Sequence, residues 1–221
     1  MSNPPLPNFF IVGTGKAGTT SLFHYLRQHP QIYMSPIKEP CYFASEIRAD
    51  NLTEAYLRHI RWLSRKLPGP LADGQPVKPL GWLASEWDDY VRLFQNVATE
   101  TAIGEASVAY LWSQTAAENI AARIPDARII MILRDPSERA FSQYLHQLAV
   151  GLTHSTFRAH IEACRNNRDR KLGTYYPLLE VGLYHDQVKR YLQRFSPANI
   201  RIYWYEEAWR EPACFLSDLF Q

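Results

Sequence analysis

A glycine-rich run near the N-terminus carries the residues best suited to chemistry, and it reads GTGKAGTTS from Gly13 to Ser21. Glycines let the backbone approach an anion closely, and the free N–H groups that open a following helix point at it. The spacing from Gly13 to Gly18 is that of a Walker A phosphate loop. Thr19 stands where an ATPase or kinase carries its lysine, and the lysine lies inside the loop at Lys16. The run predicts a phosphate-binding loop whose cation has moved; a βα turn without a ligand is the alternative.

A second group of residues is typical of an anion site at another helix N-terminus. The motif that follows Arg134 has the features of a helix start, with Asp135 as N-cap, Pro136 at the first position and Glu138 in the capping-box position. Arg134 would then lie where a strand gives way to a helix, and Ser142 would lie two turns further along. An arginine and a serine placed in this way can hold an anion. Pairing of Arg134 with a nearby carboxylate is the alternative.

Two glutamates are candidates for acid–base chemistry. Glu39 lies on a segment bracketed by Pro36 and Pro40, which disfavour a simple helical turn there. Glu105 ends a predicted strand, and ligands of open α/β sheets sit at the carboxyl ends of the strands. From the residues alone, a solvated surface position for Glu39 and a loop-capping role for Glu105 stay open.

The elements that must position these side chains alternate between strands and helices. The apolar patterns predict short strands at Phe9–Val12, Ile32–Met34, Thr101–Glu105, Arg128–Arg134 and Asn199–Tyr205. They predict helices after Gly18 and Asp135, and at Leu52–Leu67, Ser85–Phe94, Ser113–Arg123, Thr153–Asn167, Gly182–Phe195 and Phe215–Gln221, with a surface loop at Pro68–Pro79. This order predicts an α/β fold: a single domain, residues 1–221, with a P-loop-containing parallel sheet and helices on both faces.

The composition limits the class of protein and its partners. A net charge of +2 over 221 residues gives no support for nucleic-acid binding, so any attraction for an anion must be local. Three cysteines lie far apart and seven histidines show no ligand spacing, which favours a reducing compartment without a disulfide framework or a metal site. The N-terminus lacks a secretory signal pattern, and no apolar run reaches membrane-spanning length. We expect a cytoplasmic protein without a membrane segment.

Four segments together resemble the sulfotransferases that use 3′-phosphoadenosine 5′-phosphosulfate (PAPS), in particular the bacterial and heparan-sulfate-type enzymes. The segments are GTGKAGTTSL, KEPCYF, GEASVAYL and LRDPSERAFSQY. The first resembles the 5′-phosphosulfate loop, the last the 3′-phosphate motif and KEPCYF the segment with the catalytic base. The resemblance implies a sulfotransferase that moves a sulfuryl group from PAPS to a hydroxyl or amine of a glycan or small molecule and releases 3′,5′-ADP, without a metal.

The resemblance also implies roles for individual residues. The 5′-phosphosulfate would be bound by Lys16, Ala17, Gly18, Thr19, Thr20 and Ser21, and the 3′-phosphate by Arg134 and Ser142. Glu39 would be the general base, Lys16 would stabilise the leaving oxygen, and His146 would lie near the acceptor. Ala106 stands where many glycan-modifying members have a lysine. A basic, glycine-containing segment that closes over the donor in family members has no counterpart before Gln221, so we expect a truncated domain with weakened donor binding.

Two other functions stay open on the sequence. A P-loop nucleotide kinase would need a lysine after Gly18 and an acid that holds magnesium, for which Asp135 is the only good candidate. A non-catalytic sulfotransferase relative would bind 3′,5′-ADP without transfer. The sequence identifies neither the acceptor nor the oligomeric state.

Overall fold

In the computed structural model of the chain, the described residues are 5–48, 51–52, 54, 86–166 and 178–220. They contain a five-stranded sheet in which every neighbouring pair is parallel, with the order β2-β3-β1-β4-β5. The strands are β1 Phe9–Gly13, β2 Ile32–Met34, β3 Ala102–Ala106, β4 Arg128–Leu133 and β5 Ile200–Trp204. All five predicted strands and the parallel α/β fold are therefore confirmed, and no strand end is shifted by more than one residue.

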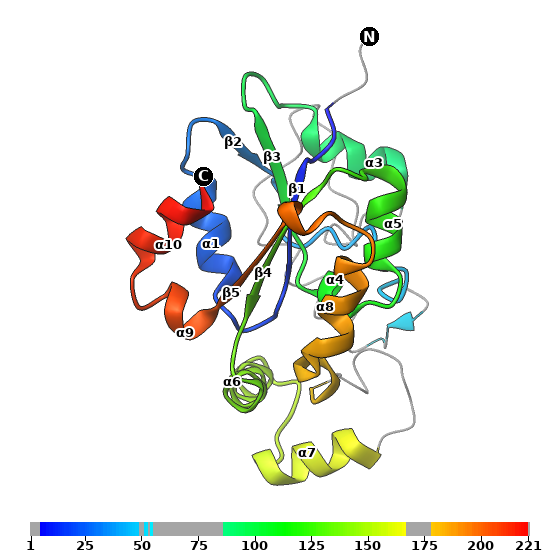
Figure 1. Ribbon diagram of the computed structural model, residues 1–221. Coiled ribbons are helices and arrows are strands. Elements are labelled where there is room, and N and C mark those ends of the chain that lie inside the picture. The colour runs from blue at the N-terminus through cyan, green and yellow to red at the C-terminus, as the bar shows by residue number, and fades with distance from the viewer. Residues whose placement is uncertain (1–4, 49–50, 53, 55–85, 167–177, 221) are drawn as a thin grey trace.

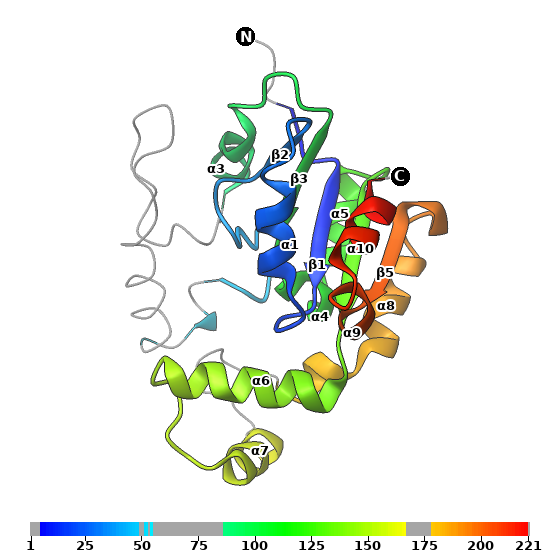
Figure 2. The same ribbon diagram turned by 90° about the vertical axis from the view of Figure 1, so that its left-hand side faces the viewer.

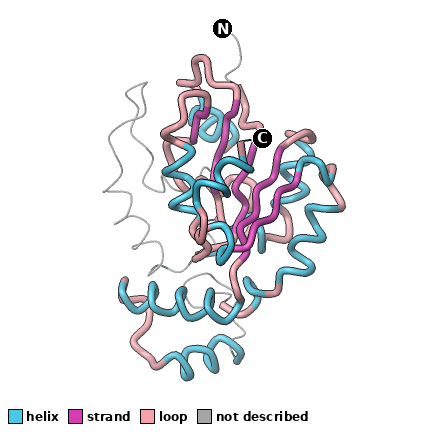
Figure 3. Tube along the Cα trace, turned by 60° about the vertical axis from the view of Figure 1, so that its left-hand side comes forward, coloured by secondary structure: helices cyan, strands magenta, loops and turns pink. Residues whose placement is uncertain are grey.

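Helices cover both faces of this sheet, as the sequence predicts (Figure 1). One face carries α1 Thr19–Leu26, α9 Tyr205–Ala208 and α10 Pro212–Leu219. The other carries α3 Trp87–Val91, α4 Ala109–Trp112, α5 Ala116–Arg123 and α8 Tyr184–Leu192. The tube in Figure 3 shows the twisted strands as one layer between these helices.

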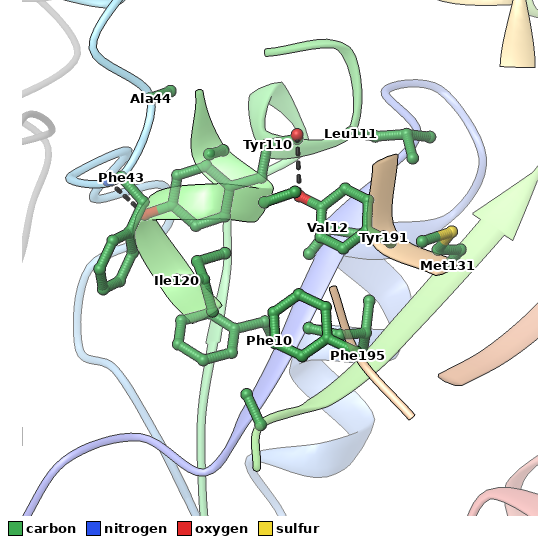
Figure 4. Close-up of a cluster of buried hydrophobic side chains, with 14 of the residues drawn as sticks. Phe10, Val12, Phe43, Ala44, Tyr110, Leu111, Ile120, Met131, Tyr191 and Phe195 are labelled. Carbon is green, nitrogen blue, oxygen red and sulfur yellow. Dashed lines mark hydrogen bonds between the residues drawn. The ribbon is translucent and has the colours of Figure 1, made fainter. Parts of the chain in front are cut away.

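The central strand β1 supplies both hydrophobic cores because its residues alternate between the two faces. Phe9 and Ile11 pack in the core beneath α1 and α10, while Phe10 and Val12 pack in the core beneath α4, α5 and α8. Figure 4 shows the second core, in which the hydroxyl of Tyr191 donates to the carbonyl of Tyr110 at 2.9 Å. Burial on both faces explains the unbroken apolar run of this strand.

Two further helices lie beyond the carboxyl end of the sheet (Figure 2). They are α6 Pro136–Ala149, which follows β4 directly, and α7 Phe157–Asn166. Short 3₁₀ helices occupy Arg92–Phe94, Glu180–Gly182 and Pro197–Asn199. Within the described parts of the chain, none of the helices combines the length and the apolar character needed to cross a membrane.

Several predicted helices differ from the observed ones. The helix predicted from Ser113 begins at Ala116, because the Ser113 hydroxyl accepts the N–H of Ala116 at 3.0 Å and so caps the helix from outside it. Helix α4 was not predicted. Leu192, predicted on the apolar face of α8, is exposed. The helix predicted at Leu52–Leu67 and the loop at Pro68–Pro79 lie outside the described residues, apart from Leu52 and Glu54.

Candidate functional site

The glycine-rich loop connects the end of β1 to the start of α1 at the carboxyl edge of the sheet. Thr14 is fully buried, and its N–H donates to the carbonyl of Ile132 on β4 at 2.7 Å. Gly18 is the N-cap of α1 and has a φ of 79°, while Lys16 has a φ of 70°. The loop therefore has the strand–turn–helix context that a phosphate-binding loop requires.

Gly18 is required both by its backbone angle and by its neighbour. A Cβ at this position would overlap the indole ring of Trp209, which follows α9. The Trp209 ring also stacks on Tyr25 of α1, with ring centroids 6.0 Å apart. Its Nε1 atom is buried and has no hydrogen-bond partner among the described residues. The corner after β5 thus packs directly against the loop.

The residues that open α1 differ in what they can offer a ligand. Ala17 and Thr19 are buried, Lys16 is partly buried, and Thr20 and Ser21 are exposed. Ala17 packs in the core beneath α1, so only its backbone can face an anion. The hydroxyls of Thr20 and Ser21 remain accessible.

Lys16 and Arg134 lie next to each other, so the two predicted anion sites form one region. Nη1 of Arg134 donates to the carbonyl of Lys16 at 3.0 Å. Burial and, to a smaller extent, the charge of Arg134 lower the pKa of Lys16. Arg134 also lies 3.7 Å from Glu138 and 4.6 Å from the ring centroid of Tyr205. Its Nε atom is buried and, within the described residues, unpartnered, as is the hydroxyl of Thr14.

The start of α6 follows the prediction in part. Oδ1 of Asp135 accepts the N–H groups of Ser137 and Glu138, each at 2.9 Å, so the predicted N-cap is confirmed. The capping box is not completed by Glu138, because the N–H of Asp135 donates to Glu206 of α9 at 3.2 Å. Glu138 turns instead toward Arg134.

Ser142 and His146 both lie on α6. Ser142 is partly buried, and His146 is exposed near the end of the helix. Gln143, next to Ser142, has its side-chain oxygen 4.0 Å from where a Cβ of Gly15 would stand, so this part of α6 faces the loop.

Glu39 is held in place and is not a freely solvated surface carboxylate. Its side chain is 23% exposed, Oε2 accepts the N–H of Val108 at 3.1 Å, and Oε1 lies 3.1 Å from Nζ of Lys38. The side chain of Val108 lies 3.6 Å from where a Cβ of Gly15 would stand. Val108 therefore lies beside the glycine-rich loop and binds Glu39, so the predicted base lies near the predicted phosphate site.

Glu105 lies at the end of β3, as predicted, but its side chain is fully buried. Tyr90 donates to Oε1 at 3.3 Å and Ser107 donates to Oε2 at 3.1 Å. Burial raises the pKa of Glu105 to about 8, against the opposing effect of these hydrogen bonds. Among the described residues its hydrogen-bond partners are side-chain hydroxyls, so neither direct contact with a ligand nor capping of a loop backbone is observed for Glu105. Ala106, which stands where many glycan-modifying sulfotransferases have a lysine, is also buried.

Several residues near the site had no role in the sequence prediction, among them Ser107, Val108, Tyr205, Glu206 and Trp209. Tyr205 ends the predicted strand at 199–205 and Glu206 and Trp209 follow it, so the rule that ligands sit at the carboxyl ends of strands could have marked these three.

The fold and the loop define a P-loop-type α/β protein with a cationic, carboxylate-bearing site at the carboxyl edge of its sheet. The family model for the sulfotransferase family matches residues 7–213. The chain belongs to the sulfotransferase family.

Similar proteins support this membership. The crystal structure of a sulfotransferase from Alicyclobacillus acidocaldarius superposes with a TM-score of 0.76, is 36% identical, and is matched over 97% of this chain and 79% of that one. The membrane-associated sulfotransferase kil1 of Dictyostelium discoideum is 32% identical over 63% of this chain. The human bifunctional heparan sulfate N-deacetylase/N-sulfotransferase 3 is 28% identical over 97% of it. The chain spans 22% of the length of each of these two relatives.

Proposed function

We propose that the chain is a sulfotransferase that moves a sulfuryl group from PAPS to a hydroxyl or amine and releases 3′,5′-ADP. The observation that carries the proposal is the position of Val108, which lies beside the glycine-rich loop and donates its N–H to the carboxylate of Glu39. A residue from a distant part of the sequence thus holds the proposed base near the phosphate-binding loop. Family membership supports PAPS as the donor.

The described residues fit both ends of this donor. Backbone N–H groups at the start of α1 and the ammonium of Lys16 would hold the 5′-phosphosulfate. Arg134 would hold the 3′-phosphate with Ser142, and its Nε atom has no hydrogen-bond partner among the described residues. The hydrogen bond from Arg134 to the carbonyl of Lys16 keeps the two cationic residues close together.

The reaction follows from these positions. Glu39 would accept the proton of the acceptor as the acceptor oxygen or nitrogen forms its bond to sulfur. The bond from sulfur to the bridging oxygen breaks, and Lys16 with the loop N–H groups would stabilise the charge left on the 5′-phosphate of 3′,5′-ADP. A sulfuryl group carries less charge than a phosphoryl group, so this scheme requires no metal.

The acceptor is proposed only as a class. Relatives are named as carbohydrate and heparan sulfate sulfotransferases, which favours a glycan or a small-molecule hydroxyl or amine. Nothing in the proposed chemistry involves a nucleic acid. The cytoplasmic location remains a prediction from the sequence.

Calorimetry with 3′,5′-ADP, ADP and ATP, each with and without magnesium, tests the donor class. We expect 3′,5′-ADP to bind most tightly and independently of magnesium. Magnesium-dependent binding of ATP in preference to 3′,5′-ADP would contradict the proposal and favour a kinase. Binding of 3′,5′-ADP without any turnover of PAPS would instead indicate a non-catalytic relative.

A further inference from the structure

Ser107 is a buried residue that no step of the proposed reaction uses. It lies directly after β3, and its side chain is fully buried. Its hydroxyl oxygen accepts the N–H of Cys41 at 3.1 Å, and its O–H donates to Oε2 of Glu105 at 3.1 Å. The N–H of Ser107 donates to the carbonyl of Ile11 on β1. Ser107 thus joins the central strand to the segment that carries Glu39.

Two parallel links hold that segment against the end of β3. The N–H of Val108 fixes the carboxylate of Glu39, and the hydroxyl of Ser107 fixes the backbone at Cys41, two residues further on. The intervening residue is Pro40, which has no N–H to offer. The Ser107 link is therefore the nearest backbone anchor described on the C-terminal side of Glu39.

Glu105 gives the Ser107 hydroxyl its direction. A serine hydroxyl has one proton to donate and two lone pairs to accept with. Because the O–H of Ser107 donates its hydrogen bond to Oε2 of Glu105, the lone pairs of the hydroxyl oxygen are free to accept the N–H of Cys41. Glu105 is fixed in turn by the hydroxyl of Tyr90. Hydrogen bonds in such a buried network are strengthened by their surroundings and are costly to leave unmade.

We propose that Ser107, oriented by Glu105, is a positioning residue that holds Glu39 at the correct distance from the glycine-rich loop for proton transfer. The inference rests on the proposed function, because it requires Glu39 to accept a proton from the acceptor. Ser107 acts through Cys41 and Pro40 and touches no reacting atom.

The test compares Ser107→Ala with the matched control Ser113→Ala. Ser113 is equally buried, donates to Oε2 of Glu46 at 2.7 Å and accepts the N–H of Ala116 at 3.0 Å. Each variant therefore removes one buried hydroxyl that bridges a carboxylate and a backbone N–H. Both variants should lower the thermal stability of the protein by a similar amount. A difference in kcat between them would therefore reflect the position of Glu39 and not a general loss of stability.

Catalysis is measured as release of 3′,5′-ADP from PAPS, with water, heparosan and 4-nitrophenol offered as acceptor probes. For Ser107→Ala we expect kcat to fall about tenfold to a hundredfold, the range for a misplaced catalytic group. The KM for PAPS and the Kd for 3′,5′-ADP should stay unchanged, since neither depends on Glu39. Ser113→Ala should leave kcat unchanged. Ser107→Thr, which returns the hydroxyl, should recover kcat.

Amide hydrogen exchange of residues 38–43 provides a second measurement that does not depend on turnover or on how Ser107→Thr folds. Exchange there should accelerate in Ser107→Ala and not in Ser113→Ala. The positioning role is overturned if Ser107→Ala keeps its kcat, or if the control loses as much, while the unmodified chain turns PAPS over. If the unmodified chain neither binds 3′,5′-ADP nor releases it, the proposed function fails and the inference fails with it.

Discussion

Glu39 is the single side chain on which the proposed proton transfer depends. Glu39→Gln keeps the shape of the side chain and its contact with the N–H of Val108, but an amide cannot accept the proton. We expect the transfer rate to fall by about a hundredfold to ten-thousandfold, as for loss of a general base. The affinity for 3′,5′-ADP, measured by calorimetry, should stay nearly the same.

Glu46→Gln is the matched control for that change. Glu46 is also partly buried, and it accepts from Ser113 and from the N–H of Gln114, on the same side of the sheet. Its replacement should affect stability and leave transfer intact. The assignment of the base is wrong if Glu39→Gln keeps its turnover or destroys nucleotide binding.

Arg134 is expected to distinguish 3′,5′-ADP from ADP. Arg134→Ala removes a charge-assisted contact to the 3′-phosphate, which is worth about 1.5–3 kcal/mol of binding free energy. The loss should appear for 3′,5′-ADP and be much smaller for ADP, which lacks that phosphate. Arg128→Ala, an exposed arginine at the opposite end of β4, should change neither affinity. Equal weakening of both nucleotides by Arg134→Ala would mean that the guanidinium binds the 5′ end or only supports the loop.

Glu105 should make the stability of the protein depend on pH. In the unfolded chain this carboxyl loses its proton near its ordinary pKa of 4.5, whereas burial raises its pKa to about 8 in the folded chain. Between these two values the folded state holds an extra proton. Its free energy of unfolding should therefore fall as the pH rises through this window, with a slope of at most about 1.4 kcal/mol per pH unit from this group.

The measurement is urea unfolding at several pH values between 5 and 8.5, in the unmodified chain and in Glu105→Gln. The groups around Glu105 are the hydroxyls of Tyr90, Tyr110 and Ser107 and, at longer range, the Glu39 carboxylate. None of the tyrosines loses its proton in this window, because burial raises the pKa values of Tyr90 and Tyr110. In Glu105→Gln, the free energy of unfolding should lose the part of its pH dependence that comes from this carboxyl. An unchanged slope in Glu105→Gln would show that another group is responsible.

The corner formed by β5 and α9 supports the site as one unit. Tyr205 lies against the guanidinium of Arg134, Glu206 accepts the N–H of Asp135, and Trp209 packs against Gly18. Three contacts from residues 205–209, which form α9 and its C-cap, therefore reach both the glycine-rich loop and the start of α6. Changes in α9 should consequently affect both ends of a bound nucleotide.

Gly18→Ala tests the packing of this corner against the loop. Gly151 has a similar φ of 73° but nothing within 4 Å of its missing Cβ, so Gly151→Ala measures the backbone cost alone. That cost is about 1–2 kcal/mol of unfolding free energy for a left-handed residue. Gly18→Ala should cost about 1–3 kcal/mol more because its methyl must displace the Trp209 ring, and it should also weaken binding of 3′,5′-ADP.

Denaturant unfolding of both variants gives this difference directly. Equal losses of stability would show that the Trp209 ring moves aside without cost. In that case the close packing of Trp209 against Gly18 would not contribute to the stability of the protein.

Much of the molecule followed from local patterns in the sequence. The strands β1 and β4 have continuous apolar runs because they are covered on both faces of the sheet, and the Asp-Pro-Ser-Glu motif marked the start of α6 correctly. Helix α4 was missed because its four residues are too few to show a helical period. The proximity of Glu39 to the loop could not be predicted, because it depends on the long-range contact with Val108.

The hydrogen bond between Arg134 and Lys16 also could not be predicted from the sequence. It uses a backbone carbonyl, and the direction of that carbonyl depends on the positive φ of Lys16. Residue types and spacing predict which groups are available to an anion. They do not predict which of those groups bind one another in its absence.

The position of β1 at the centre of the sheet sets the order in which this site can assemble. Phe9 pairs with Gly104 on one side and with Arg128 on the other, so β1 is synthesised well before the two strands that flank it. Contacts this distant in sequence form slowly because the intervening chain must first be closed into loops. A chain cut before β4 would contain the whole glycine-rich motif and still lack the anchor of Thr14 on Ile132. Donor binding should therefore appear only after β4 has been synthesised, although the glycine-rich motif is translated well before it.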